Sequence, residues 1–470
     1  MNKTTSIPTD IRTETDLLGS VEIPAANLYG INAVRGVENL TVSARNIGAC
    51  EEFTKAFALC KWAAALANHD VGVLTPAQRD AIAEACREII GGQHRDALIV
   101  DLLEGSGGTS TNMNFNEVIA NRSNQILGSA LGSYAPVHPN DHVNGSQSTN
   151  DVYPAAMKIA SHTMLAALIT ELQALATAFA AKEQEFDHIL HLGRTCLQDA
   201  QPMRLGQVFG GYAALANRLA SELQSVRNKL TVLPLGGTAI GTGFGAPQGY
   251  RKALYTHLSA LSQTPFSAPE NAFDAMQNID VFARVSGELR TAAAALAKIA
   301  SDLITLSSGP AGGIAELGLP AVQAGSSIMP GKVNPVLPMA MIQLGFAVIG
   351  NDTCIAQATQ AGQLEINHFE PVVADRLFES IHLLTAGIRQ FREKCVRGIT
   401  ANAEVNERHL FDSMAVATAL VPTLGYKKVS ALARQSVSEG RPLIEILDES
   451  GLLSRAEART RIELAAQAQF

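Results

Sequence analysis

Three stretches of the chain repeat apolar residues at alternating spacings of three and four, over residues 165–179, 282–306 and 377–395. This spacing places the apolar side chains in a narrow stripe along one face of a helix, so each stretch predicts a long helix. The flanking positions are mostly Ala, Ser, Thr and Gly rather than Lys and Glu, so the other faces of these helices are also suited to packing. The pattern therefore predicts a bundle of long helices that is shared between chains.

The regions on either side of this bundle follow different patterns. Before it the pattern is shorter and mixed, and residues 75–90 read as a helix that Thr75 caps, with Pro76 in its first turn. After residue 400 the apolar spacing changes again, and residues 436–460 read as short helices interrupted by glycines. We predict a mainly α protein of three domains. They are a mixed, mostly helical N-terminal domain (1–147), a central long-helix bundle (148–400) and a small C-terminal helical domain (401–470).

The composition points to an oligomer and against two classes of partner. Hydrophobic residues make up 47% of the chain and charged residues only 17%, so we expect other subunits to cover part of its surface. The chain has 36 Lys and Arg against 44 Asp and Glu, a net charge of −8. This balance gives no electrostatic reason to expect nucleic acid or an anionic membrane as a partner.

The cysteines and the N-terminus bear on the cellular compartment. Six cysteines are scattered without a Cys-x-x-Cys pair, which indicates reduced thiols rather than structural zinc or a disulfide framework. The first residues are polar and acidic and lack the apolar core of a signal peptide, and no apolar run is expected to reach the length of a membrane span. We therefore expect a cytoplasmic protein without a membrane segment.

Four polar segments that contain glycine interrupt this apolar chain, at residues 105–116, 139–151, 193–202 and 325–335. Ser, Thr and Asn next to Gly supply hydrogen-bond donors in a concave turn, which suits a carboxylate or a phosphate. For any single segment the simpler interpretation is helix capping, since Asp141, Ser148 and Asn150 all precede or begin a predicted long helix. Four segments of the same chemistry favour a binding site.

The segment 325–335, GSSIMPGKVNP, carries the most chemistry. Gly325, Pro330 and Gly331 provide hinges, while two serines, Lys332 and Asn334 provide hydroxyls, a cation and an amide. Such a loop can close over an anion and exclude water. On composition alone, an ordinary surface turn with a solvated Lys332 explains the segment equally well.

This segment closely resembles the signature of the fumarase and aspartase superfamily, and the likeness extends along nearly the whole chain. TETDLLGSVEIPAANLYGI, GGTSTNMNFNEVIANR, HPNDHVNGSQSTND and GRTCLQDAQPMRLGQ are similar to other segments of that family, and QSTND, VQAGSS and AGQLEINHFEP lean toward its aspartate ammonia-lyase branch. The resemblance implies a three-domain, mainly α fold whose long central helices assemble in a homotetramer, with each active site built from three subunits. It also implies a dicarboxylate substrate and reversible, cofactor-free anti elimination of ammonia from L-aspartate to fumarate.

The resemblance also assigns roles within the site. Ser326 matches the base that removes the carbon-bound proton, and Cys196 lies where the leaving group departs. The other matches are the β-carboxylate ligands Thr109, Ser148, Thr149 and Ser327, the α-carboxylate ligands Lys332 and Asn334, and the amino-group contacts Asn150 and Thr195. Proton removal puts two negative charges on one carboxylate group, and preorganised neutral donors stabilise such a species. A serine hydroxyl is a poor base, so we expect loop N–H groups and Lys332 to stabilise its alkoxide.

No metal site is expected. His142, His162, His191 and His368 are candidate ligands or acids, but none is spaced as a metal ligand with another His or Cys.

Four positions depart from the family pattern. Cys196 stands where fumarases and many aspartases carry His, Met339 where Glu is usual, Ala311 where Arg or Lys is usual, and Ala33 where Thr is usual. We attribute the paired change at Cys196 and Met339 to the cost of burying Glu without its polar partner. We interpret Cys196 as a filler of the pocket wall rather than a nucleophile, because no neighbouring base is evident.

The loss of the His and Glu pair argues against fumarase, because hydroxide benefits from a general acid whereas an ammonium group already carries its proton. Three alternatives stay open. They are fumarase-like hydration of fumarate to L-malate, an ammonia-lyase for a substituted aspartate, and a catalytically weak member kept for binding or structure.

Overall fold

The computed structural model describes residues 10–467. They divide into two compact units, each made of three segments of the chain. Unit 1 contains residues 10–168, 222–290 and 348–383, and unit 2 contains residues 169–221, 291–347 and 384–467. The boundaries between the units fall within long helices, and the division of the chain into three domains stays a prediction.

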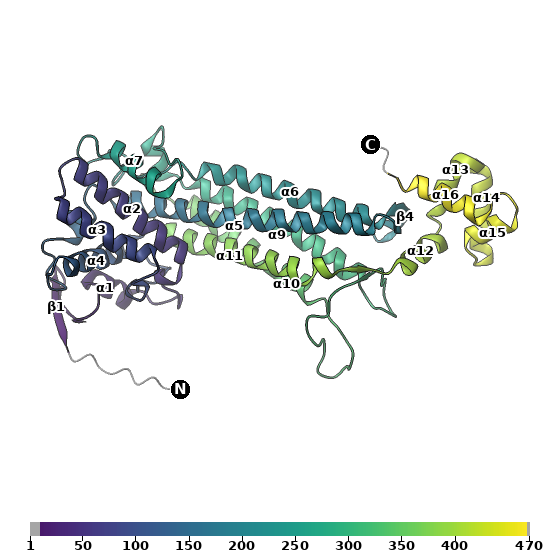
Figure 1. Cartoon of the computed structure of the whole chain (residues 1–470), viewed down its shortest axis with the longest axis horizontal. Helices are drawn as coiled ribbons and strands as arrows, with labels where there is room; N and C mark the ends of the chain where they lie inside the picture. Colours follow the sequence, from purple (N-terminus) through teal and green to yellow (C-terminus); the bar gives the residue numbers. More distant parts are fainter. Residues whose placement is uncertain (1–9, 468–470) are drawn as a thin grey trace. The chain divides into compact units, whose positions relative to one another are not determined.

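Unit 1 consists of helices and one small hairpin. Its elements are β1 (Ile11–Asp16), β2 (Gly19–Pro24), α1 (Ile31–Asn39), the short η1 (Ile47–Ala49), α2 (Glu51–Asp70), α3 (Pro76–Ile90), η2 (Arg95–Ala97), α4 (Thr109–Ile126), η3 (Pro139–Val143), α7 (Tyr250–Ser262) and α8 (Ala272–Gln277). The strands β1 and β2 pair antiparallel, α2 packs against α3 and α7, and α3 packs against α4 (Figure 1). The predicted helix 75–90 is confirmed as α3, which Thr75 and Gln78 cap reciprocally.

An aromatic cluster in the core of unit 1 fixes the helix ends that carry candidate site residues. Phe57 of α2 stacks on Phe115 of α4 with ring centroids 4.3 Å apart, and Phe53 meets Tyr153 edge to face at 5.3 Å. All four rings are almost completely buried. Because Tyr153 lies in the second turn of α5, this cluster ties the beginning of α5 to α2 and α4.

Five long helices run through both units: α5 (Thr149–Phe186), α6 (Leu205–Lys229), α9 (Asp280–Leu306), α10 (Val336–Gln360) and α11 (Glu370–Lys394). The three predicted long helices are confirmed as α5, α9 and α11, and their apolar stripes are buried, as Leu172, Leu289 and Leu384 illustrate. The prediction of a mainly α fold is confirmed. The helices α6 and α10 were not predicted.

One sequence-based expectation needs correction. By length and composition alone, α5 and α10 are apolar enough to cross a membrane, with mean hydropathies of 1.6 and 1.3 over their most apolar windows. The expectation that no apolar run reaches the length of a membrane span is therefore wrong on this measure. The core helices of soluble proteins meet the same criterion, and half of the α5 window is buried within the protein.

The rest of unit 2 holds short strands and a cluster of short helices. These elements are β3 (Leu190–Thr195), β4 (Gln198–Arg204), β5 (Leu317–Gly318), η4 (Val396–Gly398), β6 (Thr400–Ala401), α12 (Ala403–Asp412), α13 (Val416–Leu424), α14 (Tyr426–Glu439), α15 (Leu443–Glu449) and α16 (Arg455–Ala465). The short helices broken by glycine are confirmed, since Gly440 and Gly451, both at positive φ, follow α14 and α15. Leu190 and Leu192 of β3 share a buried cluster with α12, α13, α15 and α16, so this cluster holds the β3–β4 hairpin.

The six cysteines are all free thiols in the structure, as expected from their scattered positions in the sequence.

Candidate active site

The beginning of α4 presents Thr109 at its first position. Gly108 precedes it with φ of +93°, and a Cβ on this glycine would lie 2.5 Å from Cδ2 of Tyr153. Only glycine fits this close approach and this conformation. Glu104 caps the helix by accepting hydrogen bonds from the backbone N–H groups of Ser110 and Thr111 at 3.0 Å. Thr109 itself is exposed, at the end of a firmly anchored helix.

The beginning of α5 presents Ser148, Thr149 and Asn150 in succession. The capping interpretation holds for Ser148, whose Oγ accepts the N–H of Asn150 at 3.2 Å. The side-chain amide of Asn150 donates to the carbonyl of Ala239 at 2.9 Å. Asp151 lies below them, fully buried, and accepts N–H groups from Ser148, Gly236 and Thr238 at 2.9–3.1 Å. Burial raises the pKa of Asp151 to about 6, although these hydrogen bonds favour its charged form.

A buried network orients the hydroxyl of Thr149. The amide of Asn112 donates to Thr149 Oγ1 at 3.1 Å, so the hydroxyl proton of Thr149 stays free to donate to a ligand. Asn112 also donates to Asn144 Oδ1 at 3.0 Å, and the same oxygen accepts from Lys61 Nζ at 3.1 Å. Lys61 is fully buried, and burial lowers its pKa to about 7 against the opposing effect of Asp151.

Thr195 and Cys196 lie at the tip of the β3–β4 hairpin in unit 2. Thr195 pairs with Gln198, which leaves Cys196 and Leu197 as a two-residue turn with φ of +52° and +61°. This left-handed conformation matches the twist of a hairpin but is strained for Cys and Leu, which lack the freedom of Gly or Asn. The side chains of Thr195 and Cys196 are both exposed. The strained tip therefore projects two candidate site residues away from the hairpin.

Glu316 holds this hairpin close to its tip. It is fully buried and forms a two-pronged ion pair with Arg194 at 2.6 and 2.9 Å, next to Thr195 in the chain. His409 of α12 contacts the same carboxylate at 2.7 Å. Burial alone would raise the pKa of Glu316, but Arg194 and His409 outweigh it and hold the pKa below its usual value. The carboxylate thus joins the hairpin to the C-terminal helices.

The segment 325–335 forms an exposed loop in unit 2. The N–H of Gly325 donates to the carbonyl of Lys332 at 2.9 Å, and the amide of Asn334 donates to the carbonyl of Gly325 at 2.7 Å, so the two ends of the loop meet. Within the loop, Ser326 Oγ accepts the N–H groups of Ile328 and Met329 at 3.2 and 3.0 Å. These are donors of the kind expected to stabilise a serine alkoxide. Ser327 and Lys332 are exposed.

The positions that depart from the family pattern lie in different surroundings. Ala33 is fully buried in α1 and donates its N–H to Glu117, whereas Ala311 is exposed. Cys196 is exposed and Met339 is 45% exposed within this chain. The desolvation argument for the paired change at Cys196 and Met339 therefore does not hold within one chain, because neither side chain is buried there.

The candidate residues thus form separate groups within each unit. In unit 1, the Asn112–Thr149 hydrogen bond joins the helix that begins at Thr109 to the Ser148–Asn150 group. In unit 2, the hairpin tip and the 325–335 loop share no hydrogen bond among the described residues. Between residues 10 and 467, no group of three or more His, Cys, Asp and Glu side chains could hold a metal ion.

Sequence reasoning missed the residues that support these groups: Lys61, Asn112, Asn144, Asp151 and Glu316. Lys61 carried a signal, because it is a lone cation in the apolar run AFALCKWAAALA. Asn112 and Asn144 lay inside segments already marked as polar. Asp151 also lay inside a marked segment, at its last position, but its partners Gly236 and Thr238 are distant in the sequence. Glu316 had no local signal, since its partners Arg194 and His409 are distant in the sequence as well.

Comparison with known proteins defines the class. A family model described as "Lyase" matches residues 19–350, and one described as "Fumarase C C-terminus" matches residues 416–465. The chain is 43% identical to the aspartate ammonia-lyase of Helicobacter pylori, over 95% of this chain and 96% of the relative. The protein is an enzyme of the lyase class. Within that class, the chain belongs to the fumarase and aspartase superfamily.

Solved structures agree with this assignment. The fold is similar to a fumarate lyase:delta crystallin from Brucella melitensis bound to cobalt, with a TM-score of 0.95 and 40% identity over 98% of this chain and all of that one. It is also similar to a class II fumarase from Schistosoma mansoni, with a TM-score of 0.91 and 33% identity over 97% and 99% of the two chains. The mainly α fold and the superfamily indicated by the sequence motifs are therefore confirmed.

Proposed function

We propose that this protein is an aspartate ammonia-lyase that eliminates ammonia from L-aspartate reversibly to give fumarate. The observation that carries the proposal is 40–44% identity, over 95% of the chain, to aspartate ammonia-lyases of several bacteria. The general family activity on dicarboxylates supports it, and so do hydroxyl-bearing loops of the kind that bind carboxylates.

In the proposed mechanism, Ser326 Oγ, as an alkoxide, takes the proton from the carbon next to the β-carboxylate. The two loop N–H groups that point at Oγ stabilise the alkoxide. The electron pair of the broken C–H bond moves into the β-carboxylate, which becomes an enediolate-like dianion. It returns to form the C=C bond as the C–N bond breaks and ammonia leaves.

The remaining site residues bind and orient the substrate in this proposal. Thr109, Ser148, Thr149 and Ser327 donate to the β-carboxylate, and they stabilise it most once its charge has doubled. The α-carboxylate binds Lys332 and the second N–H of the Asn334 amide. Asn150 and Thr195 contact the amino group, and Cys196 forms the wall beside it. No residue is needed to protonate the leaving group, because ammonium brings its own proton.

We further propose that the active enzyme is a cytoplasmic homotetramer in which each site combines loops from three chains. The exposed apolar side chains of α10, among them Phe346 at 66% exposure, support burial of this helix by other subunits. The six free thiols suit a reducing compartment.

The test is the absorbance of fumarate measured separately with L-aspartate and with L-malate. We expect turnover of L-aspartate and little of L-malate. Faster turnover of L-malate would favour the fumarase alternative. If fumarate reacts better with hydroxylamine or a small amine than with ammonia, the enzyme is instead a lyase for a substituted aspartate. A folded oligomer without turnover of any of these compounds would identify a binding or structural protein.

A further inference from the structure

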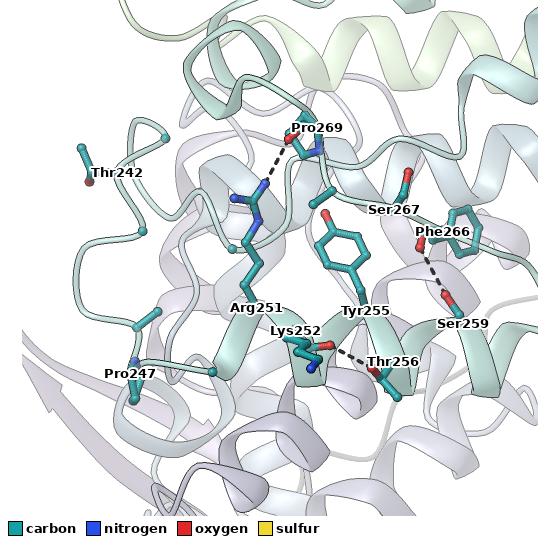
Figure 2. A pocket seen from close by; sticks show the side chains of 16 residues that line it. Thr242, Pro247, Arg251, Lys252, Tyr255, Thr256, Ser259, Phe266, Ser267 and Pro269 are labelled. Atoms are coloured by element: carbon teal, nitrogen blue, oxygen red, sulfur yellow. Dashed lines mark hydrogen bonds between the residues drawn. The ribbon is translucent and has the colours of Figure 1, made fainter.

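A cavity of about 1070 Å³ lies in unit 1 beside the first turn of α7. Its walls are a glycine-rich segment within 236–249, one side of α7, and residues 266–269. Figure 2 shows Arg251 and Tyr255 extending from α7 toward the segment that carries Ser267 and Pro269. Thr242 lies across the cavity from Arg251. We call it the α7 cavity. None of the proposed substrate-binding residues lines it.

Two adjacent cations line the α7 cavity without an acidic partner. Among the described residues, neither Arg251 nor Lys252 has a carboxylate within 4 Å, although the chain as a whole carries a net charge of −8. Arg251 Nη2 reaches the carbonyl of Pro269 only at 3.3 Å, and its buried Nε has no hydrogen-bond partner. A buried donor without an acceptor is costly, so this guanidinium is incompletely satisfied.

The start of α7 adds to this positive charge. Gly249 provides no side-chain cap, and the first turn contains no acidic residue. Arg251 and Lys252 therefore lie at the positive end of the helix dipole, where cations are unfavourable. Their own backbone N–H groups have no acceptor among residues 10–467. An anion in the cavity would relieve the repulsion between these charges and accept from these donors.

The glycine-rich wall packs closely against its neighbours. Gly236, Gly241 and Gly243 all have positive φ, a conformation that favours glycine, and a Cβ on Gly236 would lie 3.0 Å from Cγ of Arg251, so this glycine makes room for the arginine side chain. Thr242, between two of them, accepts the N–H of Phe244 on its Oγ1 at 3.3 Å, so its hydroxyl proton can donate to a ligand.

The aromatic side of the cavity is built to hold its shape. The Tyr255 hydroxyl donates to the carbonyls of Leu233 and Leu235 at 2.5 and 3.2 Å, and Ser259 Oγ donates to the carbonyl of Phe266 at 3.2 Å. These hydroxyls are used within the wall itself. The cavity is therefore preformed, with its free donors gathered around Arg251, Lys252 and Thr242.

We propose that the α7 cavity is a second ligand site of this enzyme, which binds a metabolite-sized oxyanion. Arg251 and Lys252 supply the charge, and the first-turn N–H groups of α7 and the Thr242 hydroxyl supply further hydrogen bonds. A phosphate or a carboxylate group satisfies this chemistry equally, since both present several acceptor oxygens to a guanidinium. The inference concerns binding alone and does not rest on the reaction proposed above.

The test is calorimetric titration of the purified full-length enzyme with inorganic phosphate, pyrophosphate and succinate at low salt. We expect saturable phosphate or pyrophosphate binding that Arg251→Met together with Lys252→Met weakens at least about tenfold, the usual effect of losing charge-assisted hydrogen bonds. If succinate binding weakens in parallel, the natural ligand class includes carboxylates. If only phosphate and pyrophosphate binding weakens, the ligand is a phosphate compound.

The chain offers a matched control. Helix α14 follows Gly425 and begins with Tyr426, Lys427 and Lys428, as α7 follows Gly249 and begins with Tyr250, Arg251 and Lys252. Helix α14 too lacks an acid in its first turn. Lys427 and Lys428 are exposed, as Lys252 also is, but they do not line the α7 cavity. Their double change to Met removes the same charge and is expected to leave anion binding within about twofold, since neither lysine can reach an anion bound in the cavity.

Three results would overturn the proposal. The first is that none of the three anions shows saturable binding. The second is an equal loss of anion affinity in the α7 and α14 double variants. The third is phosphate binding that succinate displaces and that the α7 changes do not affect. The last result would place the phosphate in the dicarboxylate site. If the α7 double variant fails to fold, as judged by circular dichroism, Lys252→Met and Arg251→Lys provide the same comparison, because they remove one cation or only the guanidinium fork.

Discussion

The beginnings of α4 and α5 in unit 1 and the 325–335 loop in unit 2 carry similar side chains but hold them differently. In unit 1, Thr149 is buried and its hydroxyl is oriented by Asn112. Asn112 also donates to Asn144, which accepts from Lys61 as well. In unit 2, the loop is exposed, and its hydrogen bonds join Gly325, Ser326 and Asn334 to other parts of the same loop. The first arrangement suits donors that must not move as charge develops. The second suits a base that is carried on a loop, because the loop can close over the substrate.

The largest expected effect comes from the loop. Ser326→Ala removes the proposed base and should lower kcat about 10⁴-fold, the upper range for loss of a general base, while substrate binding stays measurable. Steady-state kinetics with L-aspartate and calorimetric binding of succinate provide the two measurements. Ser327→Ala, which removes a neighbouring donor, should cost only about 10²-fold. A near-normal rate for Ser326→Ala would exclude this serine as the base.

The two regions should also differ in their tolerance of an added methyl group. Gly108→Ala forces a positive φ on alanine and places its Cβ 2.5 Å from the buried Tyr153 ring, so we expect a loss of roughly 3 kcal/mol in the free energy of unfolding. Gly331 has φ of +82°, but a Cβ added there would meet no atom within 4 Å. Gly331→Ala should therefore lower the free energy of unfolding by about 1 kcal/mol. Urea denaturation measures both. Equal losses would show that the two regions are equally rigid.

A single hydroxyl tests the preorganised donors. Thr149→Val keeps the shape of the side chain but removes the donor, and should lower kcat/KM about 10²-fold, as for other oxyanion donors. Thr149→Ser keeps the hydroxyl and should retain most of the activity. If Thr149→Val stays active and Thr149→Ser does not, the contribution of Thr149 comes from its methyl group rather than from hydrogen bonding.

The fold was largely predictable from the sequence where apolar residues recur along one face of a helix. The stripes of α5, α9 and α11 predict their burial because each turn repeats the same apolar spacing. In α6 the buried positions include Ala213, Ala216 and Ala220. These alanines differ little in hydropathy from the residues next to them in the sequence, so no apolar stripe stands out. The helix α10 is apolar on several faces, with Met339 and Phe346 exposed, so no stripe marks it.

The candidate site was predictable only in part, for a different physical reason. The hydroxyls and the loop lie in short continuous segments, which the family motifs mark. The residues that support them act across long sequence separations. Glu316 meets Arg194 and His409, and Lys61 meets Asn144, pairs that nothing local in the chain indicates. Packing alone brings such groups together.

The buried lysine beneath Thr149 gives the last and smallest expected effect. Lys61 has a pKa of about 7 in the folded protein against 10.5 when exposed, so between these values the unfolded chain binds more protons. The free energy of unfolding contributed by this group should therefore rise with pH across that window, by about 1 kcal/mol per pH unit.

Urea denaturation at pH 7, 8 and 9 measures this slope as the difference between the wild type and Lys61→Met, which removes the titrating group. Taking the difference matters because Lys158, whose pKa burial lowers to about 8, titrates in the same range in both proteins. Lys55→Met on the same helix is the matched control, since Glu51 raises the pKa of Lys55 and its titration lies above the window. A slope that Lys61→Met leaves unchanged would mean that Lys61 stays protonated throughout. The Thr149 network would then rest on a fixed buried cation rather than on one that can lose its charge near neutral pH.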